Sequence, residues 1–120
     1  MIALAAHAAL KVYLALDPCD LRKGFDGLSA LVLGHFGAQL SCDAVYVFVN
    51  KRFDRIKLLY HDNTGLWVAT KRLERGRYSW PRATQPGEKK IRLAPEALQL
   101  VLDGVDLRGA TFKPWYQRNE

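Results

Sequence analysis

The segment Val45-Tyr-Val-Phe-Val-Asn50-Lys-Arg-Phe-Asp54-Arg-Ile-Lys-Leu-Leu-Tyr-His61 decides the fold, because two strand-like runs flank a short connection. Residues 45–49 are all β-branched or aromatic, the types that favour strands. Residues 55–61 place apolar side chains at 56, 58 and 60, with the period of two that a half-buried strand requires. The two runs predict neighbouring antiparallel strands joined by a basic loop.

Further strands and two helices are expected around this pair. Residues 66–73 continue the meander, and 11–16, 78–80 and 90–93 are shorter strand candidates. Apolar side chains spaced by three or four residues from Leu21 to Phe36 predict a helix with Asp20 as its N-cap. Pro95 and Gly104 delimit a second, short helix.

We therefore expect an α+β fold with an antiparallel sheet of four to five strands. One main helix would pack on one face of the sheet, and the short C-terminal helix would cover an end or an edge. One sheet face would be apolar and buried, and the other would carry the cations.

The length of 120 residues predicts a single domain, with the Ala-rich leader 1–10 and the tail 109–120 less ordered than the rest. No apolar run approaches the roughly 20 residues of a membrane span, and the leader lacks the basic start of a secretion signal. Cys19 and Cys42 are too few for a zinc site, so reduced thiols in a cytoplasm are expected, with a disulfide between them as the alternative. Neither a cofactor nor a metal is predicted.

Positive charge is concentrated in one part of the chain. Between Lys51 and Arg92 there are twelve Lys or Arg and four acids, whereas the remainder holds six Lys or Arg and eight acids. A localised basic surface with interleaved aromatics is typical of nucleic-acid binding, although a basic face can also serve solubility alone.

The residues expected to contact nucleic acid come from three segments. They lie in the first turn of the expected helix, on the loop between two strands and the start of the second strand, or in the run from Lys71 to Pro81, where two aromatics could stack on a base. They are Arg22, Lys23, Lys51, Arg52, Arg55, Lys57, Lys71, Arg72, Arg75, Arg77, Tyr78 and Trp80. For Trp80, ordinary core packing is the competing interpretation.

Three acids are candidate catalysts. Asp20, Asp62 and Glu74 could together hold two metal ions for phosphoryl transfer. The chain shows no strand–helix–strand pattern of the kind that supports such sites, and roles in caps and turns explain the three acids more simply. A non-enzyme is therefore expected.

Four motifs occur in order: Asp20-Leu-Arg-Lys-Gly-Phe-Asp-Gly-Leu28, Val45-Tyr-Val-Phe48 with its basic loop, Ile56-Lys-Leu-Leu-Tyr-His-Asp62, and Lys71-Arg-Leu-Glu-Arg-Gly-Arg-Tyr-Ser-Trp-Pro81. With them, residues 12–107 resemble the Orf-two (TnpB) accessory proteins of bacterial insertion sequences of the sixty-six family. The resemblance implies a bacterial mobile element and a role in DNA transposition beside a separate, larger transposase that carries the acidic catalytic residues.

Three functions follow from the surface and the resemblance together. The first is a non-catalytic cytoplasmic accessory protein that binds element-end DNA through the basic face. The alternative is an interaction module that docks onto the transposase through the Trp80 region and the tail around Trp115. The third is a metal-dependent nuclease that uses Asp20, Asp62 and Glu74.

Overall fold

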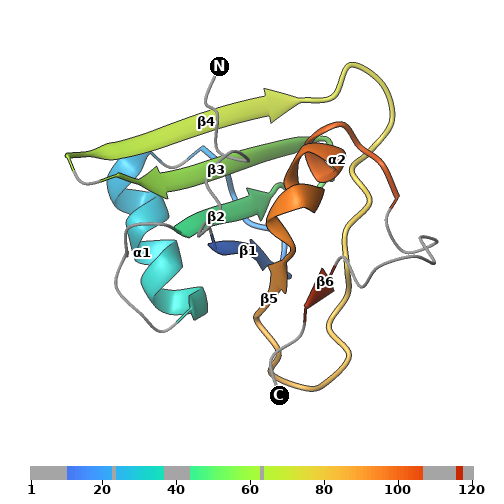
Figure 1. Ribbon diagram of the computed structural model, residues 1–120, viewed down its shortest axis with the longest axis horizontal. Helices are drawn as coiled ribbons and strands as arrows, with labels where there is room; N and C mark the ends of the chain where they lie inside the picture. Colours follow the sequence, from blue (N-terminus) through green and yellow to red (C-terminus); the bar gives the residue numbers. More distant parts are fainter. Residues whose placement is uncertain (1–10, 23, 37–43, 63, 107–115, 118–120) are drawn as a thin grey trace.

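The computed structural model describes residues 11–22, 24–36, 44–62, 64–106 and 116–117 (Figure 1). The expected α+β class is confirmed. The elements in chain order are β1 (Lys11–Ala15), α1 (Phe25–Phe36), β2 (Ala44–Val49), β3 (Arg55–His61), β4 (Leu66–Arg72), β5 (Lys90–Leu93), the 3-10 helix η2 (Pro95–Ala97), α2 (Leu98–Leu102) and β6 (Tyr116–Gln117). The leader 1–10 lies outside the described residues, and of the tail only 116–117 are described.

The described strands form one six-stranded sheet in the order β4-β3-β2-β1-β5-β6. The prediction of a wholly antiparallel sheet is wrong at one pair, because β1 and β2 run parallel while the other four pairs are antiparallel. Helix α1 connects β1 to β2 and returns the chain to the end of the sheet where β1 began, which makes the two strands parallel. The chain therefore does contain a strand–helix–strand unit, which the sequence had not indicated. The expected strand at 78–80 is absent, since these residues have no regular secondary structure.

Both faces of the central sheet are buried, which corrects the expectation of one apolar and one cationic face. All six residues of β2 are buried. Tyr46 and Phe48 belong to a core that α1 covers with Leu28 and Val32. The alternating valines of β2 belong to a second core, covered by η2, α2 and the 78–80 segment. We call these the α1-side core and the α2-side core; Figure 1 shows the two helices on opposite sides of the sheet.

The helices also differ in detail from the expectation. Helix α1 has 12 residues and α2 has 5, and each covers one face, so neither is a clear main helix. Helix α1 begins at Phe25, after the expected start at Leu21. Asp20 is not its N-cap, because the Asp20 carboxylate accepts hydrogen bonds from the backbone and side chain of Arg22. Neither helix in the described part of the chain has the length and apolarity needed to span a membrane.

An extended segment, residues 77–83, crosses the carboxyl end of β1 and is fixed by two of its aromatics. We call it the strap. The Trp80 indole Nε1 donates a hydrogen bond to the Ala15 carbonyl at 2.9 Å. The Tyr78 backbone N–H donates to the Phe53 carbonyl at 2.6 Å. The strap thereby connects β1 to the turn between β2 and β3, although it contributes no strand.

The two-sided core can be tested with neighbouring residues of β2. Phe48→Ala removes a ring from the α1-side core and should lower the free energy of unfolding by about 3–5 kcal/mol. Val47→Ala acts on the α2-side core and should cost roughly 1.5–3 kcal/mol, from the lost methyl groups and the cavity left behind. Urea unfolding followed by circular dichroism gives both values.

Gln85→Ala, in an exposed loop, is the control and should change stability by less than about 0.5 kcal/mol. If either β2 variant were as harmless as Gln85→Ala, that face of the sheet would not be a packed core.

Candidate nucleic-acid interface

The turn between β2 and β3 is held rigidly by Asn50. The Asn50 side-chain oxygen accepts hydrogen bonds from the backbone N–H groups of Asp54 and Arg55, both at 3.0 Å. Its amide nitrogen donates to the Asp54 carboxylate at 2.7 Å. This hydrogen bond, together with the nearby positive charges of the turn, lowers the pKa of Asp54. The turn therefore presents its exposed tip residues, Lys51 and Arg52, on a preorganised backbone.

Four of the predicted cations gather around one pocket beside this turn. The pocket has a volume of about 320 Å³ and lies where the carboxyl ends of the parallel strands β1 and β2 meet. We call it the basic pocket; its lining residues are Cys19, Asp20, Leu21, Arg22, Asn50, Lys51, Arg52 and Arg55. Four cations thus face a single carboxylate.

That carboxylate belongs to Asp20 and is paired with Arg22. The two side chains approach to 2.7 Å, and the Arg22 side chain is 88% exposed. The hydrogen bond and the charge of Asp20 raise the pKa of Arg22. The pair neutralises one of the four cations. Asp54 lies in the same turn and interacts with the charges of Arg52 and Arg55, but it does not line the pocket, so positive charge remains in excess there.

The sheet next to the pocket adds further positive charge on its α1 side. Ile56 and Leu58 of β3 belong to the α2-side core, so the alternating Arg55 and Lys57 project from the other face. Arg72 on β4 is the direct cross-strand partner of Arg55. Like charges at opposed positions of a sheet are destabilising, and an anion bound between them would relieve the repulsion.

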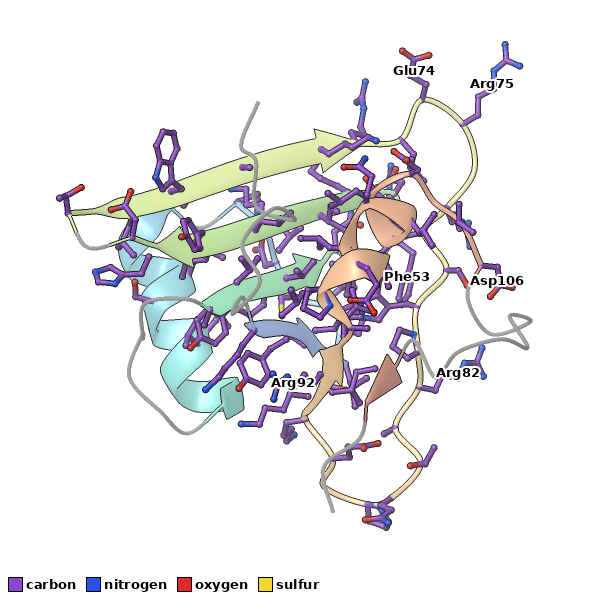
Figure 2. The ribbon with its side chains drawn as sticks, viewed as in Figure 1. Phe53, Glu74, Arg75, Arg82, Arg92 and Asp106 are labelled. Carbon is purple, nitrogen blue, oxygen red and sulfur yellow. The ribbon has the colours of Figure 1, made fainter. Side chains whose placement is uncertain are left out.

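The remaining predicted cations lie elsewhere. Lys71 is opposite Ile56 and lies on the α2 side, where its ammonium donates to the Leu102 carbonyl at 2.8 Å and pairs with Asp103 at 3.5 Å. Arg75 points away from the sheet at the tip of the loop that follows β4 (Figure 2). Arg77 lies on the strap and lines a second pocket. Lys23 falls outside the described residues.

The two aromatics expected to stack on bases are buried in the α2-side core. Tyr78 is 4% exposed and Trp80 is 6% exposed. Burial raises the pKa of Tyr78 to about 12, and its hydroxyl donates to the Lys71 carbonyl at 3.4 Å. This burial does not favour the expected stacking on exposed rings: the two aromatics anchor the strap, and only their edges are left to line the second pocket described below.

The three candidate catalytic acids do not form one cluster. Asp62 and Glu74 lie beyond opposite ends of the seven-residue strand β4, and Asp20 is paired with Arg22. Asp62 organises the β3–β4 turn, where its carboxylate accepts hydrogen bonds from the backbone of Thr64 and Gly65 and from the indole of Trp67. Among the described residues no cluster of three or more His, Cys, Asp or Glu could hold a metal ion. Asp20 is therefore an ion-pair residue and Asp62 a turn residue, while Glu74 is exposed in the loop after β4.

The second pocket contains residues that the sequence did not single out. Its volume is about 500 Å³, and it is lined by Leu16, Asp17, Pro18, Phe53, Arg77, Tyr78, Ser79, Trp80, Pro81, Arg82 and Ala83. Phe53, Ser79 and Arg82 were not candidates, nor was Asn50 in the turn. The excess of positive charge between residues 51 and 92 includes Arg82, and Asn50 is a residue type that favours turns, so the sequence offered a signal for both. It offered no signal for Phe53 or Ser79.

Cys19, which lines the basic pocket, is a buried thiol that forms no disulfide, and its Sγ donates a hydrogen bond to the Asp17 carbonyl at 3.4 Å. Burial, with a smaller effect from the charge of Asp17, raises its pKa, so the group is a protonated thiol at neutral pH. Cys42 lies outside the described residues.

The chain is similar to one protein family and to two curated relatives. Residues 10–111 match the model of the family described as "IS66 Orf2 like protein". An uncharacterised protein of Sinorhizobium fredii (strain NBRC 101917 / NGR234), y4jC, is 33% identical over 105 residues, which are 88% of this chain and 87% of the relative. A second uncharacterised protein of that strain, y4hO, is 30% identical over 99 residues, or 82% and 84% of the two chains. No solved structure shows a significant match.

The hydrogen bonds of Asp62 predict that the β3–β4 turn loses stability at low pH. These hydrogen bonds, above all the one from the Trp67 indole, lower the pKa of Asp62 to about 2. Because this pKa lies below the unfolded value of roughly 3.9, the stabilisation is complete above about pH 4 and is lost as the pH falls towards 2. Carboxyl carbon shifts followed by NMR should give a titration midpoint near 2 for Asp62.

Trp67→Phe removes one donor and should move the Asp62 midpoint upward, and Asp62→Asn should weaken the pH dependence of urea unfolding in the same range. A wild-type midpoint near 4 would contradict the hydrogen-bonded turn.

Proposed function

Because the chain belongs to the IS66 Orf2-like family, we propose that it is a non-enzymatic accessory protein for transposition that binds DNA phosphates through the basic pocket and the adjoining strand face. The family supports the setting of a bacterial insertion sequence and a role beside the element's transposase. The DNA-binding step is inferred from the chemistry of the surface.

One observation carries the proposal, namely that Arg22, Lys51, Arg52 and Arg55 surround one pocket with a single opposing carboxylate. Gathering like charges around a hollow is unfavourable unless an anion occupies it. Phosphate oxygens suit these groups well, because guanidinium groups bind them with paired hydrogen bonds and lysine as a point charge. The rigid Asn50 turn lowers the entropy lost when Lys51 and Arg52 become ordered on a ligand.

The strand face extends the charge beyond one phosphate. Arg55 and Arg72 are opposed across β3 and β4, and Lys57 follows on the same face. Successive phosphates along one strand of nucleic acid could contact the pocket and then this face. Such contacts fix position rather than sequence, so we expect affinity that depends strongly on salt and weakly on base sequence.

A second candidate, docking onto the transposase, is favoured by an exposed aromatic that the sequence had not selected. Trp67 is 50% exposed, and its indole is held by Asp62 at 2.8 Å. A fixed, half-exposed tryptophan suits a protein contact, since such rings are enriched at binding hot spots. Of the residues first expected to dock, Trp80 is buried and Trp115 lies outside the described residues.

Salt-dependent binding tests the DNA proposal. Each lost phosphate contact should reduce the slope of log K against log salt by about 0.9. The double variant Lys51→Ala with Arg52→Ala should therefore reduce it by about 2, with weaker binding to all sequences. Fluorescence anisotropy with a labelled element-end oligonucleotide, between about 50 and 200 mM salt, measures this slope.

Lys11→Ala is the matched control for the single variant Arg52→Ala, because it also removes one exposed charge. Lys11 begins β1, so it lies about 15 Å of strand away from the carboxyl end where the pocket is formed. Equal losses in both single variants would indicate a non-specific charge effect, and an unchanged slope in the double variant would refute the pocket as a phosphate site.

A further inference from the structure

The second pocket is built from three segments that hydrogen bonds tie together. We call it the strap pocket. The loop after β1 is joined to the end of β2 by the Cys19 N–H and the Val49 carbonyl at 2.8 Å. Tyr78 and Trp80 tie the strap to the β2–β3 turn and to β1, as described above. The walls of the pocket are therefore held in place in the absence of a ligand.

The strap pocket adjoins the basic pocket, because the same two loops line both. In the loop after β1, residues 16–18 line the strap pocket and 19–22 line the basic pocket. In the β2–β3 turn, Arg52 lines the basic pocket and its neighbour Phe53 lines the strap pocket. Phe53 has a φ of +59°, a left-handed backbone conformation that is unusual for a bulky residue.

The chemistry of the strap pocket differs from that of its neighbour. Apolar surface comes from Leu16, Phe53 and Pro81, and polar groups come from Asp17, Ser79 and two arginines. The volume of about 500 Å³ falls within the roughly 300–1,000 Å³ of small-molecule sites. The Ser79 hydroxyl is buried and has no hydrogen-bond partner among the described residues, so it is an unsatisfied polar group in the wall of the pocket. A flat ligand with polar edges fits this mixture.

We propose that the strap pocket holds one unpaired nucleobase of a DNA strand whose neighbouring phosphates lie in the basic pocket, so that the protein prefers single-stranded or locally opened DNA to a duplex. The inference rests on the proposed function and specifies its substrate. Phosphate and base are joined by one sugar, and the two adjoining pockets match these two parts of one nucleotide. Phe53 offers a ring for stacking. The Asp17 carboxylate lies 3.6 Å from the Lys89 ammonium and is 59% exposed, so it can still accept a hydrogen bond from the amino group of a base.

An enclosed pocket favours an unpaired strand over a duplex. A base in a duplex is stacked and paired, so it must leave the helix before side chains can enclose it. An unpaired strand has no such requirement.

Two comparisons on the full-length wild-type protein test the inference without any variant. A labelled single-stranded 12-mer should bind roughly tenfold more tightly than the same sequence as a duplex at equal salt. A second 12-mer carries an abasic site at every third nucleotide, so it keeps all the phosphates but lacks a third of the bases. This change should remove most of the single-strand advantage. Equal affinity for single strand and duplex, each with a steep salt slope, would overturn the inference and leave the proposed function intact. Absence of DNA binding at low salt would overturn both.

Two variants locate the effect. Phe53→Asn removes the ring while retaining a residue that tolerates the left-handed conformation, and it should abolish the single-strand preference with the salt slope unchanged. Since Phe53 also packs on the α2-side core, thermal unfolding must confirm that the variant is folded. Ser79→Ala removes an unpartnered hydroxyl and should fold normally, with single-strand affinity lowered about threefold.

Retention of the single-strand preference in both variants would overturn the assignment. So would a folded Phe53→Asn protein that binds both DNA forms as wild type does but no longer captures the purified transposase, because the pocket would then be a protein-docking site.

Discussion

Strand β2 is buried on both faces, and the arrangement of the covers around it depends on this burial. A strand enclosed in this way must have apolar side chains at every position, as Ala44–Val49 does. It also requires a cover on each side. Helix α1 provides one, and the strap with η2 and α2 provides the other. The two covers bring distant parts of the chain to the same end of the sheet.

The parallel pairing of β1 and β2 determines where the candidate site forms. Because both strands end at the same edge, the loop that leaves β1 and the turn that leaves β2 are neighbours. Arg22 from the first and Lys51, Arg52 and Arg55 from the second meet there around the basic pocket. The strap crosses the same edge through the Trp80–Ala15 hydrogen bond and forms the second pocket. An antiparallel β1–β2 pair would have placed these groups at opposite ends.

Sheet geometry also divides the basic run from Lys71 to Pro81 among several environments. Side chains alternate across a strand, so Arg72 joins Arg55 on the α1 side while Lys71 binds the end of α2 on the other side. Farther along the run, Tyr78 and Trp80 turn into the core because their rings bury large apolar areas and their polar atoms find backbone partners. One continuous basic and aromatic stretch of sequence therefore has three separate roles in space. Arg72 lies on a strand face, Lys71 forms an ion pair, and Tyr78 and Trp80 anchor the strap.

The sequence by itself determined the family, the α+β class and the β2–β3–β4 meander, because these depend on local motifs and on side-chain periodicity. It also indicated the basic turn, since Lys51, Arg52 and Arg55 lie close together along the chain. Only the tertiary structure decided the parallel β1–β2 pair, the burial of both sheet faces and the roles of Tyr78 and Trp80. It alone placed Arg22 beside the turn and Phe53 beside Ser79. Pairing direction and burial arise from contacts between residues far apart in the chain, and local periodicity carries no information about such contacts.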